Sequence, residues 1–147
     1  MNFKDYLIAT ANVANEEKEI LDILSTKDTL SPIELRAAKN SLQVMIENLI
    51  GKSKRILKNY NCPIIPQRSK DALNFLYDIG AIEDEEYHSL SGAIGFRNSM
   101  IHDYMKFNND ILYIILKEKR YIDIYNFLLD KAEYKQIIIT RIENYTF

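Results

Sequence analysis

The chain has 147 residues, of which 47% are hydrophobic and 27% charged, so it can bury the core of one domain. Its 19 basic and 21 acidic residues give a net charge of −2, which excludes a generally basic nucleic-acid binder and restricts such contacts to a local patch. The single cysteine, Cys62, excludes an intramolecular disulfide and a cysteine-based zinc site within one chain. The N-terminus lacks the apolar run of a signal peptide, and no apolar stretch is long enough to span a bilayer. We therefore expect a cytoplasmic protein without membrane contact.

The first half of the sequence predicts two long helices. The first covers about residues 3–24, with a broken apolar stripe at Tyr6, Ala9, Val13, Ile20 and Leu24. The second has the clearest start in the chain, because Ser31-Pro32-Ile33-Glu34 combines an N-cap serine, a proline at the first helical position and a capping-box glutamate. Its core face repeats every seven residues, at Leu35, Leu42, Leu49 and Ile56.

The second half predicts further helices and no strands. A third helix over about residues 67–79 ends at Gly80, and a fourth begins near Glu83 and ends around residues 102–104, with its inner face at Tyr87, Leu90, Ile94 and Ile101. A last helical region runs from Asn108 to about Asn144, with a break near residues 117–120. Glycine and proline are scarce, and no segment alternates apolar and polar residues over strand length. We expect residues 1–147 to form one all-α, up-and-down bundle of about five helices.

The motif that carries chemistry is Arg97-x4-His102-x-Tyr104, at the end of the fourth predicted helix. An arginine binds phosphate oxygens through its planar fork, and a histidine transfers protons near neutral pH. Residues five apart on a regular helix differ by about 140°, so Arg97 and His102 do not share a face. Two features could still bring them together within one chain, namely the length of the arginine side chain and a departure of the backbone from the helix at His102. The other possibilities are a two-fold dimer that pairs the two residues across chains, or two basic residues that only favour a helix C-terminus.

These residues resemble the signature of HEPN-type ribonucleases, and specifically of the HepT toxins in bacterial HepT–MntA toxin–antitoxin pairs. The resemblance extends over about residues 30–128, including the segments 34–38, 41–47, 73–84 and 95–104. It implies a HEPN-like fold and a homodimer in which two motifs face one cleft. It also implies metal-independent endoribonuclease activity without a cofactor, with Arg97 and His102 as the catalytic pair. Asn98 corresponds to the family's polar neighbour of the arginine and would orient the histidine.

The resemblance also implies a partner and a modification. In HepT toxins the tyrosine of the His-x-Tyr motif is modified with AMP by MntA, a minimal nucleotidyltransferase that acts as antitoxin. In this chain the modified residue would be Tyr104. An AMP group there would add negative charge and bulk, both of which oppose RNA binding. The residues alone allow a plainer interpretation, in which Tyr104 packs against Met105 and Phe107.

A basic stretch over residues 51–70 is a second candidate for RNA contact, since it holds six basic and no acidic residues. The members on the second predicted helix are Lys52, Lys54, Arg55 and Lys58. Cations are also favoured at a helix C-terminus, so a solvated face is the preferred interpretation. His88 lies outside any metal-ligand spacing, so we predict no metal site and expect a surface or boundary residue.

The sequence is compatible with three functions. The first is a ribonuclease toxin that is neutralised by AMPylation of Tyr104. The second is a catalytically inactive helical subunit that binds substrate or partner for a minimal nucleotidyltransferase. The third is a dimerisation bundle whose apolar seam is its only function. The complete Arg-x4-His-x-Tyr motif favours the first.

Overall fold

The computed structural model describes residues 1–145, and of these every side chain except that of Tyr104. This part of the chain contains seven α-helices, one 3-10 turn and no strand. Its elements are α1 (Phe3–Ser25), α2 (Pro32–Asn59), α3 (Asp71–Asp78), α4 (Asp84–His102), η1 (Tyr104–Lys106), α5 (Asn109–Lys117), α6 (Tyr121–Leu129) and α7 (Gln136–Glu143). The all-α prediction is therefore confirmed.

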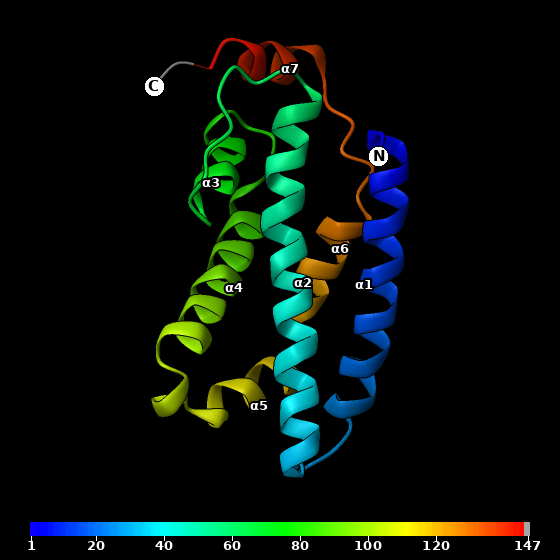
Figure 1. The fold of residues 1–147 in the computed structure, drawn as a ribbon, viewed down its shortest axis with the longest axis vertical. Helices are drawn as coiled ribbons and strands as arrows, with labels where there is room; N and C mark the ends of the chain where they lie inside the picture. The colour runs from blue at the N-terminus through cyan, green and yellow to red at the C-terminus, as the bar shows by residue number, and fades with distance from the viewer. Residues whose placement is uncertain (146–147) are drawn as a thin grey trace.

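Helix α2 is the central element of the bundle. Figure 1 shows α2 along the length of the molecule, with α1 on one side, α3 and α4 on the other, and α7 across one end. Helix α6 packs against both α1 and α2. No helix in residues 1–145 is long and apolar enough to cross a membrane.

The start of α2 forms as its sequence predicts. The Glu34 amide donates to Ser31 Oγ at 3.2 Å, and the Ser31 amide donates to Glu34 Oε1 at 2.9 Å, which completes the capping box. From there α2 directs its predicted heptad face inward: Ala38, Leu42, Met45, Leu49 and Ile56 are almost fully buried, and Leu35 packs at the edge of the core. Helix α2 is therefore stabilised mainly by packing of this face in the core, and less by helix propensity.

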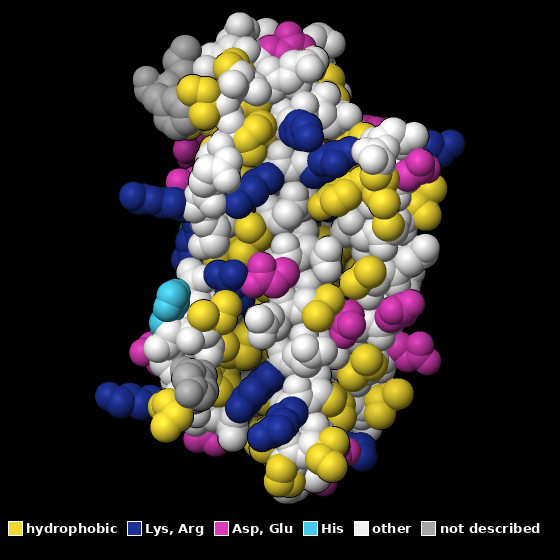
Figure 2. Space-filling model, viewed as in Figure 1, with side chains coloured by type: hydrophobic (Ala, Val, Ile, Leu, Met, Phe, Trp, Pro, Cys, Tyr) yellow, Lys and Arg dark blue, Asp and Glu magenta, His cyan; other side chains and the backbone are white. Residues whose placement is uncertain are grey.

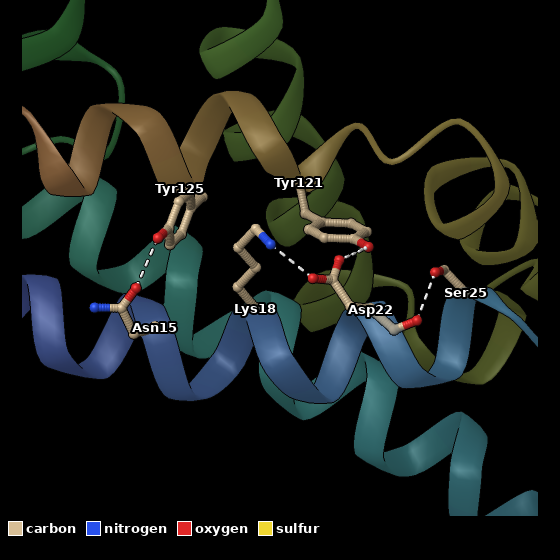
Figure 3. Close-up of polar contacts among 6 residues, drawn as sticks. All are labelled: Asn15, Lys18, Asp22, Ser25, Tyr121 and Tyr125. Carbon is tan, nitrogen blue, oxygen red and sulfur yellow. Dashed lines mark hydrogen bonds and ion pairs between the residues drawn. The ribbon is translucent and has the colours of Figure 1, made fainter.

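Polar side chains of α1 bind tyrosine hydroxyls of α6 (Figure 3). The Tyr121 hydroxyl donates to Asp22 Oδ1 at 2.6 Å, and Lys18 binds Asp22 Oδ2 at the same distance. Burial opposes ionisation of Asp22, but the bonds from Lys18 and Tyr121 outweigh it and hold the pKa of this carboxyl below its ordinary value. Burial, together with the bond to Asp22, raises the pKa of Tyr121 to about 12. Farther along, the Tyr125 hydroxyl donates to Asn15 Oδ1 at 2.7 Å.

The helix count was underestimated, because the last region contains three helices instead of one with a single break. The predicted break near residues 117–120 is present, and Lys119 there adopts φ +51°. A second break over residues 130–135 was missed, although Ala132 also has positive φ. Alanine carries no turn signal of its own, but Asp130 Oδ1 accepts the Ala132 amide at 2.7 Å, and the Tyr60 hydroxyl donates to the Ala132 carbonyl at 2.6 Å. The Ala132 side chain is completely buried.

Two further details differ from the predicted helices. The third helix begins at Asp71 instead of residue 67, because residues 68–71 form a turn closed by the Asp71 amide and the Arg68 carbonyl. Two predicted inner-face residues, Ile20 and Ile101, are each 39% exposed, while their neighbours Leu21 and Met100 are buried instead. The apolar pattern predicted the correct helices but was one residue out of phase at these positions.

Candidate active site

Arg97 lies on the last two turns of α4 and reaches across to α2. Its Nε donates to Glu47 Oε1 at 2.6 Å, and its Nη2 lies 2.6 Å from the same oxygen. Its Nη1 donates to Asn98 Oδ1 at 3.0 Å. The Arg97 side chain is 22% exposed and that of Glu47 is 43% exposed. The guanidinium is therefore held in a defined place at the surface, where α4 faces α2.

His102 is the last residue of α4, and it is exposed. The Asp103 amide still bonds to the Ser99 carbonyl at 2.9 Å, so the helix is regular up to His102. Departure from the helix begins only at Asp103, with φ −120° and ψ 28°. Backbone departure at His102 therefore does not bring the two residues together within one chain. A single protomer presents Arg97 and His102 on different faces of α4.

Asn98 contacts the arginine rather than the histidine. Its side-chain oxygen accepts the bond from Arg97 Nη1, so in this structure it helps to orient the guanidinium. The expected role of Asn98 in orienting His102 is thus not the one observed.

The segment after α4 is tied to the helix by aromatic contacts. Phe107 packs edge-on against Phe96 at 5.3 Å between ring centroids, and Lys39 of α2 lies 5.0 Å from the centre of the Phe107 ring. Asn108 then caps α5, because its Oδ1 accepts the Asp110 amide at 2.8 Å. The backbone of Tyr104 opens η1, two residues after His102, the last residue of α4. Its side chain, on which the modification is predicted, lies outside the described part of the structure.

The predicted basic patch on α2 does not form as one surface. Lys52 is completely buried, and its Nζ donates to the carbonyl oxygens of Phe127 and Asp130, each at 2.6 Å. The prediction that Lys52 contacts RNA is therefore wrong: the apolar environment of α2 and α6 surrounds its stem, and the last carbonyls of α6 bind its ammonium.

The other three members of the patch remain nearer the surface but are dispersed. Lys54 donates to the Gln67 carbonyl at 2.9 Å, and Arg55 donates to the Met1 carbonyl at 2.5 Å while stacking on Tyr6. Lys58 is exposed. Figure 2 shows basic side chains spread along the face on which α2 runs, with acidic ones among them. RNA contact by Lys54, Arg55 and Lys58 stays a prediction.

Glu47 contacts Arg97 but was not predicted as part of the site from the motif. It is fifty positions from Arg97 in the sequence, so no local spacing connects the two. A signal was nevertheless present: Glu47 is the only acidic residue between Glu34 and Asp71, a stretch rich in lysine and arginine. An isolated carboxylate among basic residues is a candidate for a specific ion pair.

A cavity within the bundle does not include the motif residues. About 530 Å³ in volume, it lies between α2, α4, α5 and α6, and no residue predicted for the site lines it. Its walls are mainly apolar, with a polar rim at which Ser89 donates to Asp123 at 2.6 Å. His88 lies on this rim and is exposed, which agrees with a boundary residue. Among residues 1–145 no group of three or more His, Cys, Asp or Glu side chains is placed to hold a metal ion.

The bundle has the architecture of HEPN proteins. A solved toxin–antitoxin structure with AMP-PNP matches it with a TM-score of 0.74 at 20% identity, covering 94% of this chain and 99% of the other. A tri-AMPylated HEPN toxin from Shewanella oneidensis, solved in complex with an MNT antitoxin, matches with a TM-score of 0.77 at 23% identity, covering 90% and 100%. These likenesses show the HEPN-like fold.

The family follows from the sequence itself. Residues 11–130 match the family described as Ribonuclease HepT-like. No curated protein sequence matches the chain. Because the family match spans most of the chain and contains the whole Arg-x4-His-x-Tyr motif, the chain belongs to the HepT-like ribonucleases.

Proposed function

We propose that this protein is the endoribonuclease toxin of a toxin–antitoxin pair, and that it cleaves RNA without a metal ion at a composite site in a homodimer. The observation that carries the proposal is an intact Arg97-x4-His102 motif in a HepT-like chain. The separation of the two side chains on α4 supports the dimer, because one protomer alone does not bring a phosphate-binding arginine and a histidine to the same point.

The chemistry follows from these two side chains. One His102 accepts the proton of a ribose 2′-hydroxyl, and the 2′-oxygen attacks the adjacent phosphorus. The bond from phosphorus to the 5′-oxygen breaks, and the second His102 of the dimer protonates this leaving oxygen. The products are a 2′,3′-cyclic phosphate and a 5′-hydroxyl. Arg97 stabilises the negative charge that develops on the phosphoryl oxygens in the transition state.

Neutralisation would come from a minimal nucleotidyltransferase of the MntA type, which transfers AMP from ATP to the Tyr104 hydroxyl, with pyrophosphate as the leaving group and loss of the hydroxyl proton. Supporting this proposal, the HEPN toxin of Shewanella oneidensis is described as tri-AMPylated and in complex with an MNT antitoxin. The tyrosine is two positions from His102 in the sequence, so an added phosphodiester would bring negative charge close to the proposed site.

The decisive experiment is RNA cleavage by the purified protein in EDTA. The wild type should cut single-stranded RNA, and His102→Ala should not, while both proteins remain dimeric by light scattering. Equal cutting by both proteins would remove His102 from the mechanism. Activity that disappears in EDTA and returns with a divalent ion would refute the metal-independent reaction.

Co-expression with the adjacent nucleotidyltransferase gene tests the neutralisation. Mass spectrometry of the intact protein should show additions of AMP in the wild type, and none in Tyr104→Phe. Adducts that persist in Tyr104→Phe would place the modification elsewhere.

A second function remains a candidate, namely a catalytically inactive helical subunit for the nucleotidyltransferase. It is favoured by one observation: a carboxylate, Glu47, already occupies one edge of the arginine that would bind phosphate. This alternative predicts a stable complex with the transferase and no RNA cleavage, even at high protein concentration.

A further inference from the structure

We infer that Glu47 is the positioning residue of this site, which holds Arg97 so that the outer N–H groups of its guanidinium face the substrate phosphate. The inference rests on the proposed ribonuclease function. Its basis is the contact between α2 and α4, where one carboxylate oxygen of Glu47 binds two nitrogens of the same guanidinium at 2.6 Å.

The hydrogen bonds of Arg97 leave part of its fork available. A guanidinium carries five N–H donors. Glu47 engages one on Nε and one on Nη2, and Asn98 engages one on Nη1. Two donors therefore remain, one on each Nη, which is the number that a bidentate phosphate contact requires.

The surroundings explain why a carboxylate is needed. An arginine side chain has four rotatable bonds, and at 22% exposed Arg97 would otherwise sample several positions at the surface. Glu47 projects from α2, which the core holds rigidly, since Leu49 and Ile46 on either side are at most 1% exposed. The ion pair thus transfers the rigidity of α2 to the guanidinium, which places the charge before substrate arrives.

The arrangement also predicts which kinetic constant Glu47 controls. A group that orients Arg97 for the transition state affects kcat, whereas a group that only binds RNA affects KM. Removing the negative charge of Glu47 does not weaken attraction for RNA, so KM should not rise. A simple brake, in which Glu47 competes with phosphate, would instead give a higher kcat/KM when the carboxylate is removed.

The test compares Glu47→Ala, Glu47→Gln and the control Glu16→Ala, which removes an exposed carboxylate from α1. We expect kcat for a short single-stranded RNA to fall about 100-fold in Glu47→Ala with KM nearly unchanged. Glu47→Gln retains an acceptor oxygen of the same reach and should recover to within about tenfold of wild type, because only the charge assistance is lost. Glu16→Ala should match wild type. Unchanged or increased kcat in both Glu47 variants would overturn the inference.

A second measurement separates this inference from the proposed function. The Arg97 Nε–H resonance in a nitrogen-edited NMR spectrum, assigned with Arg97→Lys, should exchange slowly with water in the wild type and at least about tenfold faster in Glu47→Ala. If the wild type does not cleave RNA but this protection is present, the ribonuclease proposal fails while the positioning of Arg97 stands. If the resonance is equally exposed in both proteins, Glu47 does not hold Arg97 and the inference fails.

Discussion

Lys52 and Arg97 are both basic residues on helices of the same bundle, and each is bound by oxygens from another element. Lys52 is buried, and its ammonium binds two carbonyls near the end of α6. Arg97 lies at the surface, and its guanidinium binds a carboxylate while two donors remain available. A cation whose donors are all directed into the protein stabilises the fold. A guanidinium that is bound along one edge, with N–H groups left over, can also bind a ligand.

Substitution of Arg97 should have the largest effect, a loss of RNA cleavage. Arg97→Ala should lower the rate of RNA cleavage by about 100- to 1,000-fold, because charge on the transition-state phosphate loses its partner. Arg97→Lys should not restore the rate, since an ammonium cannot reproduce the planar fork. Single-turnover cleavage with circular dichroism as the folding control measures this. If an Arg97 variant cleaves RNA at the wild-type rate, Arg97 does not stabilise the transition-state phosphate.

Lys52 should show the opposite pattern, with an effect on stability and none on RNA. Lys52→Met keeps the length of the side chain but leaves the carbonyls of Phe127 and Asp130 without this donor, so the free energy of unfolding should fall by about 2 kcal/mol. Denaturant unfolding measures the loss. RNA affinity of the folded variant, and its salt dependence, should equal those of wild type, and a reduced salt dependence would return Lys52 to the RNA-binding surface.

The hydrogen bond between Tyr121 of α6 and Asp22 of α1 provides a comparison with Lys52 in which the donor is an uncharged hydroxyl. Tyr121→Phe removes the hydrogen bond to Asp22 from a fully buried ring, and should lower the free energy of unfolding by about 1 kcal/mol. Tyr125→Phe is the matched control, because its bond to Asn15 lies nearer the solvent and should contribute less. Denaturant midpoints of the two variants make the comparison, and a larger loss in Tyr125→Phe would contradict it.

The smallest effect concerns pH. Burial lowers the pKa of Lys52 to about 8, against about 10.4 in an unfolded chain. Between these values the unfolded chain binds more protons, so the stability of the wild type should rise with pH relative to that of Lys52→Met. We expect a relative gain of about 0.7 kcal/mol between pH 7.5 and 8.5. The neutral amine still offers two N–H donors for its two carbonyls. A relative loss of wild-type stability over this range would show that the ammonium is favoured in the fold.

The fold was largely predictable because its signals are local. The capping box at Ser31 and the heptad face of α2 depend on neighbouring residues, and both appear as predicted. Gly80 likewise has the positive φ expected for a residue after a helix end. The break at Ala132 was harder to predict, because the Tyr60 hydroxyl that binds its carbonyl is 72 positions away and the burial of its methyl group depends on the whole fold.

The candidate site was predictable only in its parts. The Arg97–His102 spacing identified the residues, and the regular helix confirms that they diverge within one chain. The contact between Arg97 and Glu47 joins positions fifty residues apart, and the burial of Lys52 depends on α6, more than seventy residues further along. Neither contact leaves a periodic or short-range pattern in the chain.

The amino-acid sequence was enough to predict an all-α chain with an intact Arg-x4-His-x-Tyr motif, because helix signals and motif spacing depend on residues close together in the chain. Only the tertiary structure decided which cations are available. Lys52 and Arg97 carry the same charge and differ in what packs around them: carbonyls at the end of α6 surround one, and a carboxylate beside open solvent holds the other. Desolvation and hydrogen-bond satisfaction, which depend on the whole fold, separate a structural cation from one that can bind phosphate.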